Sequence, residues 1–288
     1  MSAPDQLVVV IDAVARRNDG ESVRIARDVL RAGAHTKICL PETPAEFARA
    51  LARRGSRRPV VIGDDRALLR AVALLHRGRE LADGALSMVP VGPRGAVELA
   101  GALGVPLSTV PAARAVLEGA ARRLDLLVDD GDDVVVRELR VLAAGAAGDP
   151  RAPDGGPSVW GTCRSLVRTL VGPAHPGARV PAIRSHRLRV EADGRVLCDT
   201  GDPVEGVTVQ PAGGAAEVVV RPRAAEPVRT RAAAVTVSGA PFRYHADGLP
   251  GGPVTTRTWT LRPGAWSLTL PAVVPVDADP RPRGTAVP

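Results

Sequence analysis

The stretch Pro59-Val-Val-Ile-Gly-Asp-Asp-Arg-Ala-Leu-Leu69 decides the fold of this chain. Its β-branched apolar start predicts a buried strand, Gly63-Asp64 predicts a tight turn, and the residues from Arg66 onward predict a helix. Such a turn can cradle a phosphate, because glycine lets the backbone approach the anion and the helix N-terminus presents amides to it. A plain strand-to-helix turn is the alternative, since a lone Gly-Asp after a strand is a weak signal.

The segments around this stretch repeat the alternation of strand and helix. The helix beginning at Thr43-Pro44 has the expected cap, with threonine before proline and Glu46 in the first turn. Strands that alternate with helices predict a parallel sheet covered on both faces. The expected strands are 7–11, 36–40, 60–62 and 85–90, and the expected helices are 21–32, 44–54, 66–76, 96–103 and 111–122.

The second half of the chain has the two-residue period of half-buried strands. The runs 124–128 and 134–139 flank Asp129-Asp-Gly-Asp-Asp133, which predicts a hairpin. This acidic turn lacks the loop length and distal glutamate of an EF-hand, so a solvated turn is favoured over a calcium site. From Arg187 onward the pattern predicts an antiparallel β-sandwich. Its expected strands are 188–190, 195–197, 207–209, 217–220, 234–237, 258–261 and 266–270.

These patterns predict an N-terminal parallel-sheet α/β domain followed by a C-terminal antiparallel β-sandwich domain. The α/β domain is expected over 1–123 and the sandwich over 124–274, with a disordered tail over 275–288. Within the second domain, the composition predicts a flexible loop over 145–157 and a helix over 159–170.

Composition restricts the partners of the chain. The net charge is +7, and nearly all of the positive charge is arginine because Lys37 is the only lysine. The arginines are dispersed, which favours a solvated basic surface; the alternative is attraction to anionic lipid headgroups, at about 1 kcal/mol per basic residue near a charged bilayer. Nucleic acid is disfavoured, because aromatic side chains that could stack on bases are not interleaved with the arginines.

Cysteine usage and hydropathy predict a cytoplasmic protein. Cys39, Cys163 and Cys198 are far apart and show neither disulfide nor zinc spacing. The first residues lack the basic segment and cleavage site of a signal peptide. No apolar run approaches the ~18 residues of a membrane span, so we expect at most peripheral contact with a membrane surface. The oligomeric state is left open.

Several motifs, in order, resemble the diacylglycerol kinase family of bacterial lipid kinases, which have an NAD kinase-like fold. Ile62-Gly-Asp-Asp-Arg66 stands where the family has Gly-Gly-Asp-Gly-Thr between a strand and a helix. Pro90-Val-Gly92 and Leu103-Gly-Val-Pro106 resemble the family's next loop, and Asp247-Gly-Leu249 stands at its Asp-Gly-Glu. The resemblance covers most of the chain at weak identity.

The resemblance implies ATP-dependent, magnesium-dependent phosphorylation of a lipid hydroxyl, in a cleft between the two domains. By this resemblance the nucleotide would be bound by Gly63, Asp64, Asp65, Arg66 and Gly92. Magnesium would be held by Asp64 and Asp65, and the catalytic residues would be Asp247 and Asp64.

The departures from the family pattern favour a pseudoenzyme. Ile11-Asp12 stands where the family has Asn-Pro, and Asp65 replaces a glycine. A carboxylate ~4 Å from phosphate oxygens would cost about 4 kcal/mol at an effective dielectric of 20. Leu249 replaces the glutamate that takes the proton from the lipid hydroxyl, and loss of a general base costs roughly 10²–10⁴ in rate. We therefore expect phosphotransfer to be weakened or lost.

Two alternatives stay open. The activity could be rescued if Asp64 and Asp65 held magnesium, Arg66 bound a phosphate and Asp247 acted as the base. The chain could instead need neither ATP nor magnesium and act as a non-catalytic module that binds a lipid, an anionic ligand or a protein.

Overall fold

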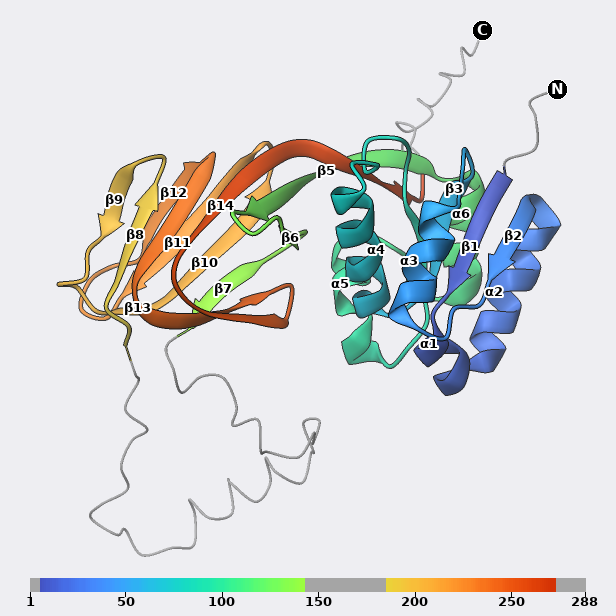
Figure 1. The fold of residues 1–288 in the computed structure, drawn as a ribbon, viewed down its shortest axis with the longest axis horizontal. Coiled ribbons are helices and arrows are strands. Elements are labelled where there is room, and N and C mark those ends of the chain that lie inside the picture. Colours follow the sequence, from blue (N-terminus) through green and yellow to red (C-terminus); the bar gives the residue numbers. More distant parts are fainter. Residues whose placement is uncertain (1–5, 143–184, 273–288) are drawn as a thin grey trace, which may run out of the picture. The chain divides into compact units, whose positions relative to one another are not determined.

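The computed structural model describes residues 6–142 and 185–272 (Figure 1). The chain forms two compact units, one of Met1–Leu124 with Ala265–Pro288, called unit 1, and one of Asp125–Gly264, called unit 2. The last strand of the described residues thus contributes to both units, which its sequence pattern did not indicate. The loop expected over 145–157, the helix expected over 159–170 and the tail over 275–288 lie outside the described residues.

Unit 1 is built on a four-stranded parallel sheet of order β2-β1-β3-β4, which confirms the predicted α/β architecture (Figure 1). The central strands are buried on both faces, and for this reason they have continuous apolar runs without alternation. The strands are β1 Gln6–Ile11, β2 His35–Cys39, β3 Arg58–Gly63 and β4 Ser87–Pro90.

Helices cover both faces of this sheet. On one face, α2 and α6 share an apolar cluster with alternate residues of β1, among them Leu7 and Val9. On the other face, α3 packs against β1 and α4 packs against β3. The helices are α1 Ala13–Asn18, α2 Gly20–Gly33, α3 Pro44–Ala52, α4 Asp65–Arg77, the 3-10 turn η1 Arg94–Ala96, α5 Glu98–Ala102 and α6 Thr109–Glu118.

The helix ends follow local chemistry. Thr43 caps α3 as predicted, because its side chain accepts the backbone N–H of Glu46 at 3.2 Å. The helix expected to reach residue 122 is shorter and ends at Glu118. Gly119 is extended there, and a Cβ on it would lie 2.3 Å from the carbonyl oxygens of Ala115 and Leu270. The chain turns at this glycine and continues as β5.

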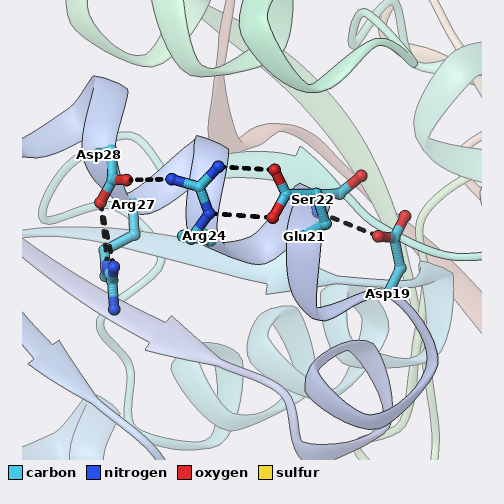
Figure 2. A network of polar contacts seen from close by, with 6 residues as sticks. All are labelled: Asp19, Glu21, Ser22, Arg24, Arg27 and Asp28. Atoms are coloured by element: carbon cyan, nitrogen blue, oxygen red, sulfur yellow. Dashed lines mark hydrogen bonds and ion pairs between the residues drawn. The ribbon is translucent and has the colours of Figure 1, made fainter.

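Helix α2 has a polar network along its exposed side (Figure 2). Asp19 caps the helix by accepting the N–H of Ser22 at 3.0 Å. Arg24 pairs with Glu21 at 2.6 Å and with Asp28 at 3.2 Å. These exposed pairs each stabilise the helix by a few tenths of a kcal/mol at most, so burial of the opposite face holds α2 in place.

Unit 2 is antiparallel, as predicted. The order is β12-β11-β10-β7-β13-β14-β5-β6, with β8 pairing β13 and β9 pairing β8 (Figure 1). The expected hairpin is present, with Leu127 opposite Val135. The strands are β5 Ala120–Asp129, β6 Val134–Val135, β7 Leu139–Leu142, β8 Leu188–Ala192, β9 Arg195–Cys198, β10 Val204–Ala212, β11 Ala215–Pro222, β12 Val228–Ala232, β13 Ala234–Ala246 and β14 Leu249–Leu270.

Strand β13 changes partner along its length. Its first half pairs with β8 at Val235–Gly239 and its second half pairs with β7 at His245 and Ala246, with register shifts between Ser238 and Phe242. Strands β8 and β9 therefore lie in a second layer, in contact with β12 and β11. A core of alternate residues from both layers surrounds the fully buried Trp259.

Several strands of unit 2 differ from the expectation. The run expected over 134–139 is divided between β6 and β7, and the strand expected over 234–237 continues to Ala246 as β13. Strand β12 was not expected, because this edge strand alternates arginine with threonine and has little apolar signal. The runs 258–261 and 266–270 belong to one strand, β14. Gly264 allows this continuation with φ +53°, and its N–H donates to Asp125 at 2.8 Å. Among the described residues, no helix is long and apolar enough to cross a membrane.

Candidate functional site

Ligands of open parallel sheets bind beyond the carboxyl ends of the strands. In unit 1 this C-terminal edge consists of Asp12 after β1, Gly63–Arg66 after β3 and Val91–Ala100 after β4. It contains each of the expected nucleotide and metal residues, namely Gly63, Asp64, Asp65, Arg66 and Gly92.

Asp12 is a structural cap at this edge. One carboxylate oxygen accepts the N–H of Val14 at 2.8 Å and starts α1, while the other accepts a bond from Arg70 at 3.0 Å. Arg70 also lies over the Phe47 ring, 5.3 Å from its centroid. Asp12 is buried, so the Arg70 guanidinium compensates a charge that solvent reaches poorly.

Gly63 is needed because the turn is crowded. A Cβ at this position would lie 2.8 Å from the Cβ of Ala67 and 3.1 Å from that of Asp12. The next residue, Asp64, caps α4 by accepting the N–H of Ala67 at 3.0 Å. The preceding Ile62, which stands in place of a family glycine, is fully buried in the cluster under α2 and α6. The turn is therefore packed tightly by its own side chains.

Asp65 binds across the loop to a second helix. Its two carboxylate oxygens accept the N–H groups of Leu99 at 2.8 Å and Ala100 at 2.9 Å, at the start of α5. Burial raises the pKa of the Asp65 carboxyl above its usual range, and the two amide bonds oppose this shift. The carboxylate that the family resemblance made a candidate magnesium ligand thus joins α4 to α5.

Gly92 brings the loop after β4 against the turn after β3. Its φ is +158°, and a Cβ there would lie 3.6 Å from the Cβ of Asp64. The N–H of Val91 donates to the carbonyl of Gly63 at 2.8 Å. The two loops that the family resemblance assigned to the nucleotide are therefore in contact.

Two arginines at this edge have no internal role. Arg66 in the first turn of α4 and Arg94 in η1 are exposed. Neither guanidinium forms a hydrogen bond or ion pair with the part of the chain that the structure describes. Both side chains are therefore available to bind an anionic ligand at the C-terminal edge.

Asp247, the expected catalytic base, lies in unit 2 in the turn between β13 and β14. Its carboxylate accepts the N–H groups of Val136 at 2.7 Å, Arg137 at 2.9 Å and Glu138 at 2.8 Å. Burial raises the pKa of Asp247, and these three bonds oppose that shift. Asp247 therefore fixes the loop between β6 and β7. Leu249, two residues later, is 40% exposed at the start of β14.

Sequence reasoning found the turn and its aspartates but missed the ion pair of Asp12 with Arg70 and the exposed Arg94. For Arg70, the available signal was its spacing of four residues from Arg66, which places both arginines on one side of the predicted helix. Within residues 6–142 and 185–272, no group of three or more histidine, cysteine, aspartate or glutamate side chains is placed to hold a metal ion.

Comparison with known proteins identifies the fold. No protein-family profile and no curated protein matches the chain. Solved structures do match. Two describe a putative diacylglycerol kinase from Bacillus anthracis str. Sterne, with TM-scores of 0.72 and 0.67, at 13% and 14% identity. Each comparison covers 94% of this chain, and 96% and 98% of the respective other chain.

A third structure, of a diacylglycerol kinase from the same organism, matches with a TM-score of 0.62 at 11% identity. It covers 94% of this chain and 98% of the other chain. The order of elements, a parallel α/β sheet followed by a large antiparallel sheet, is thus the diacylglycerol kinase-like fold.

Proposed function

We propose that this chain is a lipid kinase-like protein that has lost phosphotransfer and binds an anionic ligand at the C-terminal edge of the unit 1 sheet. The diacylglycerol kinase-like fold supplies the lipid kinase-like part of this proposal. The loss of phosphotransfer and the ligand are inferred from the residues at the edge.

One observation carries the proposal. Of the helices in the described part of the chain, three start at this edge, and the chain's own aspartates occupy their N-terminal amides: Asp12 on α1, Asp64 on α4 and Asp65 on α5. Backbone amides at helix starts are what a nucleotide phosphate would need. A phosphate group would have to displace a carboxylate or lie beside it, and both options are unfavourable.

The second feature that argues against phosphotransfer is the lack of a proton acceptor at position 249. Leu249 has no group that can take a proton from a lipid hydroxyl. The nearby Asp247 carboxylate already accepts three backbone N–H groups, so its use as a base would weaken the loop that it holds. Loss of both nucleotide positioning and general base accounts for an inactive kinase fold.

The exposed Arg66 and Arg94 favour binding of an anion. An anionic group on the outer side of the loops could accept bonds from both guanidinium groups without displacing the internal aspartates. A lipid phosphate at a membrane surface has this chemistry, and each basic residue near an anionic surface adds about 1 kcal/mol.

Calorimetry with magnesium and ATP tests the loss of nucleotide binding. We expect no saturable heat up to millimolar ATP. Micromolar binding that disappears in Asp64→Asn, together with phosphate transfer to a lipid, would instead establish an active kinase with an altered loop.

Sedimentation with vesicles tests the anion site. We expect binding to phosphatidylcholine vesicles that contain phosphatidic acid and none to phosphatidylcholine alone. Arg66→Gln and Arg94→Gln should weaken this binding. Arg114→Gln on α6 is the matched control, because Arg114 is also exposed and its substitution removes the same charge. Equal weakening by all three variants would mean diffuse attraction and contradict a site.

A further inference from the structure

A recess lies at the opposite edge of the unit 1 sheet, where β3 and β4 begin. The turn after α3 and the loop after α4 form its walls, and its volume is about 360 Å³. This volume is within the range of sites for small molecules, roughly 300–1,000 Å³. The charged residues of its lining are Arg54, Arg57, Arg58, Glu80 and Asp83.

Arg54 is the fixed cation of the recess. Its side chain is 9% exposed and pairs with Glu80, and its second terminal nitrogen lies 3.9 Å from Asp83. The two carboxylates are much more exposed, at 36% and 63%. Solvent can therefore hydrate the carboxylates if a ligand displaces them, while the guanidinium stays in the wall and needs an anionic partner.

Arg57 supplies a second cation with no internal partner. Its backbone N–H donates to the carbonyl of Arg54 at 3.3 Å in a turn that contains Gly55 with φ +60°. Arg57 as a residue is half-buried, and its guanidinium forms no hydrogen bond or ion pair with the described residues. Arg58, in contrast, has an internal partner, because its guanidinium donates to the carbonyl of Val116 at 2.8 Å.

The charges of the lining select the kind of ligand. The lining contains three arginines and two acidic residues, so its net charge is +1. A cation would meet this excess of positive charge, whereas an oxyanion would find Arg57 available for charge-assisted hydrogen bonds.

We propose that this recess binds a small molecule through a phosphate or carboxylate group, with Arg57 as the main donor and Arg54 as the second. The site is separate from the anion site at the C-terminal edge, since the six residues of β3 span about 17 Å between them. Guanidinium groups suit both oxyanions because their paired N–H groups match two oxygens.

Isothermal titration calorimetry tests this site. Inorganic phosphate and, separately, succinate are titrated into the full chain at low ionic strength. We expect saturable binding of at least one, and the stronger of the two identifies the oxyanion. Arg57→Gln should weaken it at least about tenfold, as expected for loss of a charge-assisted hydrogen bond. Arg53→Gln is the matched control, because Arg53 is the neighbouring exposed arginine but lies outside the recess lining.

A second variant protects the test against a folding defect. Ser56 is an exposed lining residue, so Ser56→Glu should fold normally while its carboxylate repels the ligand. Weaker binding in Arg57→Gln and Ser56→Glu, with Arg53→Gln and Arg66→Gln unchanged, supports the site. Absence of saturable heat with both probes, or equal weakening by Arg57→Gln and Arg53→Gln, overturns it. Weakening by Arg66→Gln alone would also overturn it, because the anion would then bind at the other edge.

Discussion

The carboxylate of Asp65 accepts the backbone N–H of Ala100 at 2.9 Å, across 35 positions of the sequence. With the parallel bond from Leu99, it fixes the start of the short helix α5 to the start of α4. An aspartate that replaces a glycine of the family pattern is therefore part of the folded framework of the edge.

Asp65→Asn should destabilise the protein by about 1–2 kcal/mol, because an amide oxygen can replace only one of the two carboxylate acceptors. Chemical denaturation measures the change in the free energy of unfolding. Glu98→Gln is a suitable control, since Glu98 is exposed and lies in the first turn of α5, beside the two amides that Asp65 binds. It should change stability by less than about 0.5 kcal/mol. Equal stability of Asp65→Asn and wild type would show that the bonds to α5 contribute nothing.

Gly63→Ala should cost about 1–3 kcal/mol, because the added methyl group would lie 2.8 Å from the Cβ of Ala67 and overpack the turn. Gly95→Ala introduces the same methyl group where nothing lies within 4 Å, so the same denaturation experiment should show little loss. Similar losses in both variants would contradict a packing requirement at Gly63.

Asp247→Ala should destabilise unit 2 by about 3 kcal/mol, because three backbone N–H groups lose their acceptor. Hydrogen exchange should show faster exchange at Val136, Arg137 and Glu138. Glu226→Ala removes an exposed carboxylate elsewhere in unit 2 and should leave both measurements unchanged. Protection of the three amides that persists in Asp247→Ala would rule out this anchoring role.

Asp19→Ala should cost about 1 kcal/mol through loss of the α2 cap. The backbone hydrogen bond from Ser22 lowers the pKa of Asp19 below the usual 3.8. Because folding lowers the pKa of this carboxyl, its ionised form stabilises the folded state at pH values above the usual pKa. This contribution is lost as the pH falls through the lowered pKa. The stability difference between wild type and Asp19→Asn should therefore shrink below pH 3.8. A difference that is constant across that range would disprove the linkage.

Local patterns predicted much of unit 1. Each central strand is a short apolar run, and Thr43 caps α3 as predicted. The helix-capping role of Asp64 on α4 was not predicted. The contact of Asp65 with α5 was not predictable, because it depends on how two loops 34 residues apart meet. The end of α6 was missed because the close approach of Gly119 to Leu270, a residue far along the chain, cannot be seen in the local sequence.

In unit 2, the two-residue period identified strands with apolar faces but not β12, whose polar alternation resembles an exposed loop. The Asp247-Gly248 turn was predicted, yet the partners of Asp247 were not, because they lie about 110 positions earlier in the chain. The resemblance of Asp247-Gly-Leu249 to the family's Asp-Gly-Glu made Asp247 a candidate base, whereas the bonds that it forms are those of a structural anchor.

The three amide bonds of Asp247 change what an alanine scan of this chain would report. Replacement of an acidic residue in an active-site motif is usually interpreted as a test of chemistry, and a dead variant is counted as proof of an enzyme. Here the same substitution would release a loop, so any ligand or assay that depends on intact unit 2 would respond to it. At this position, lost activity would reveal a folding defect as readily as a missing proton acceptor.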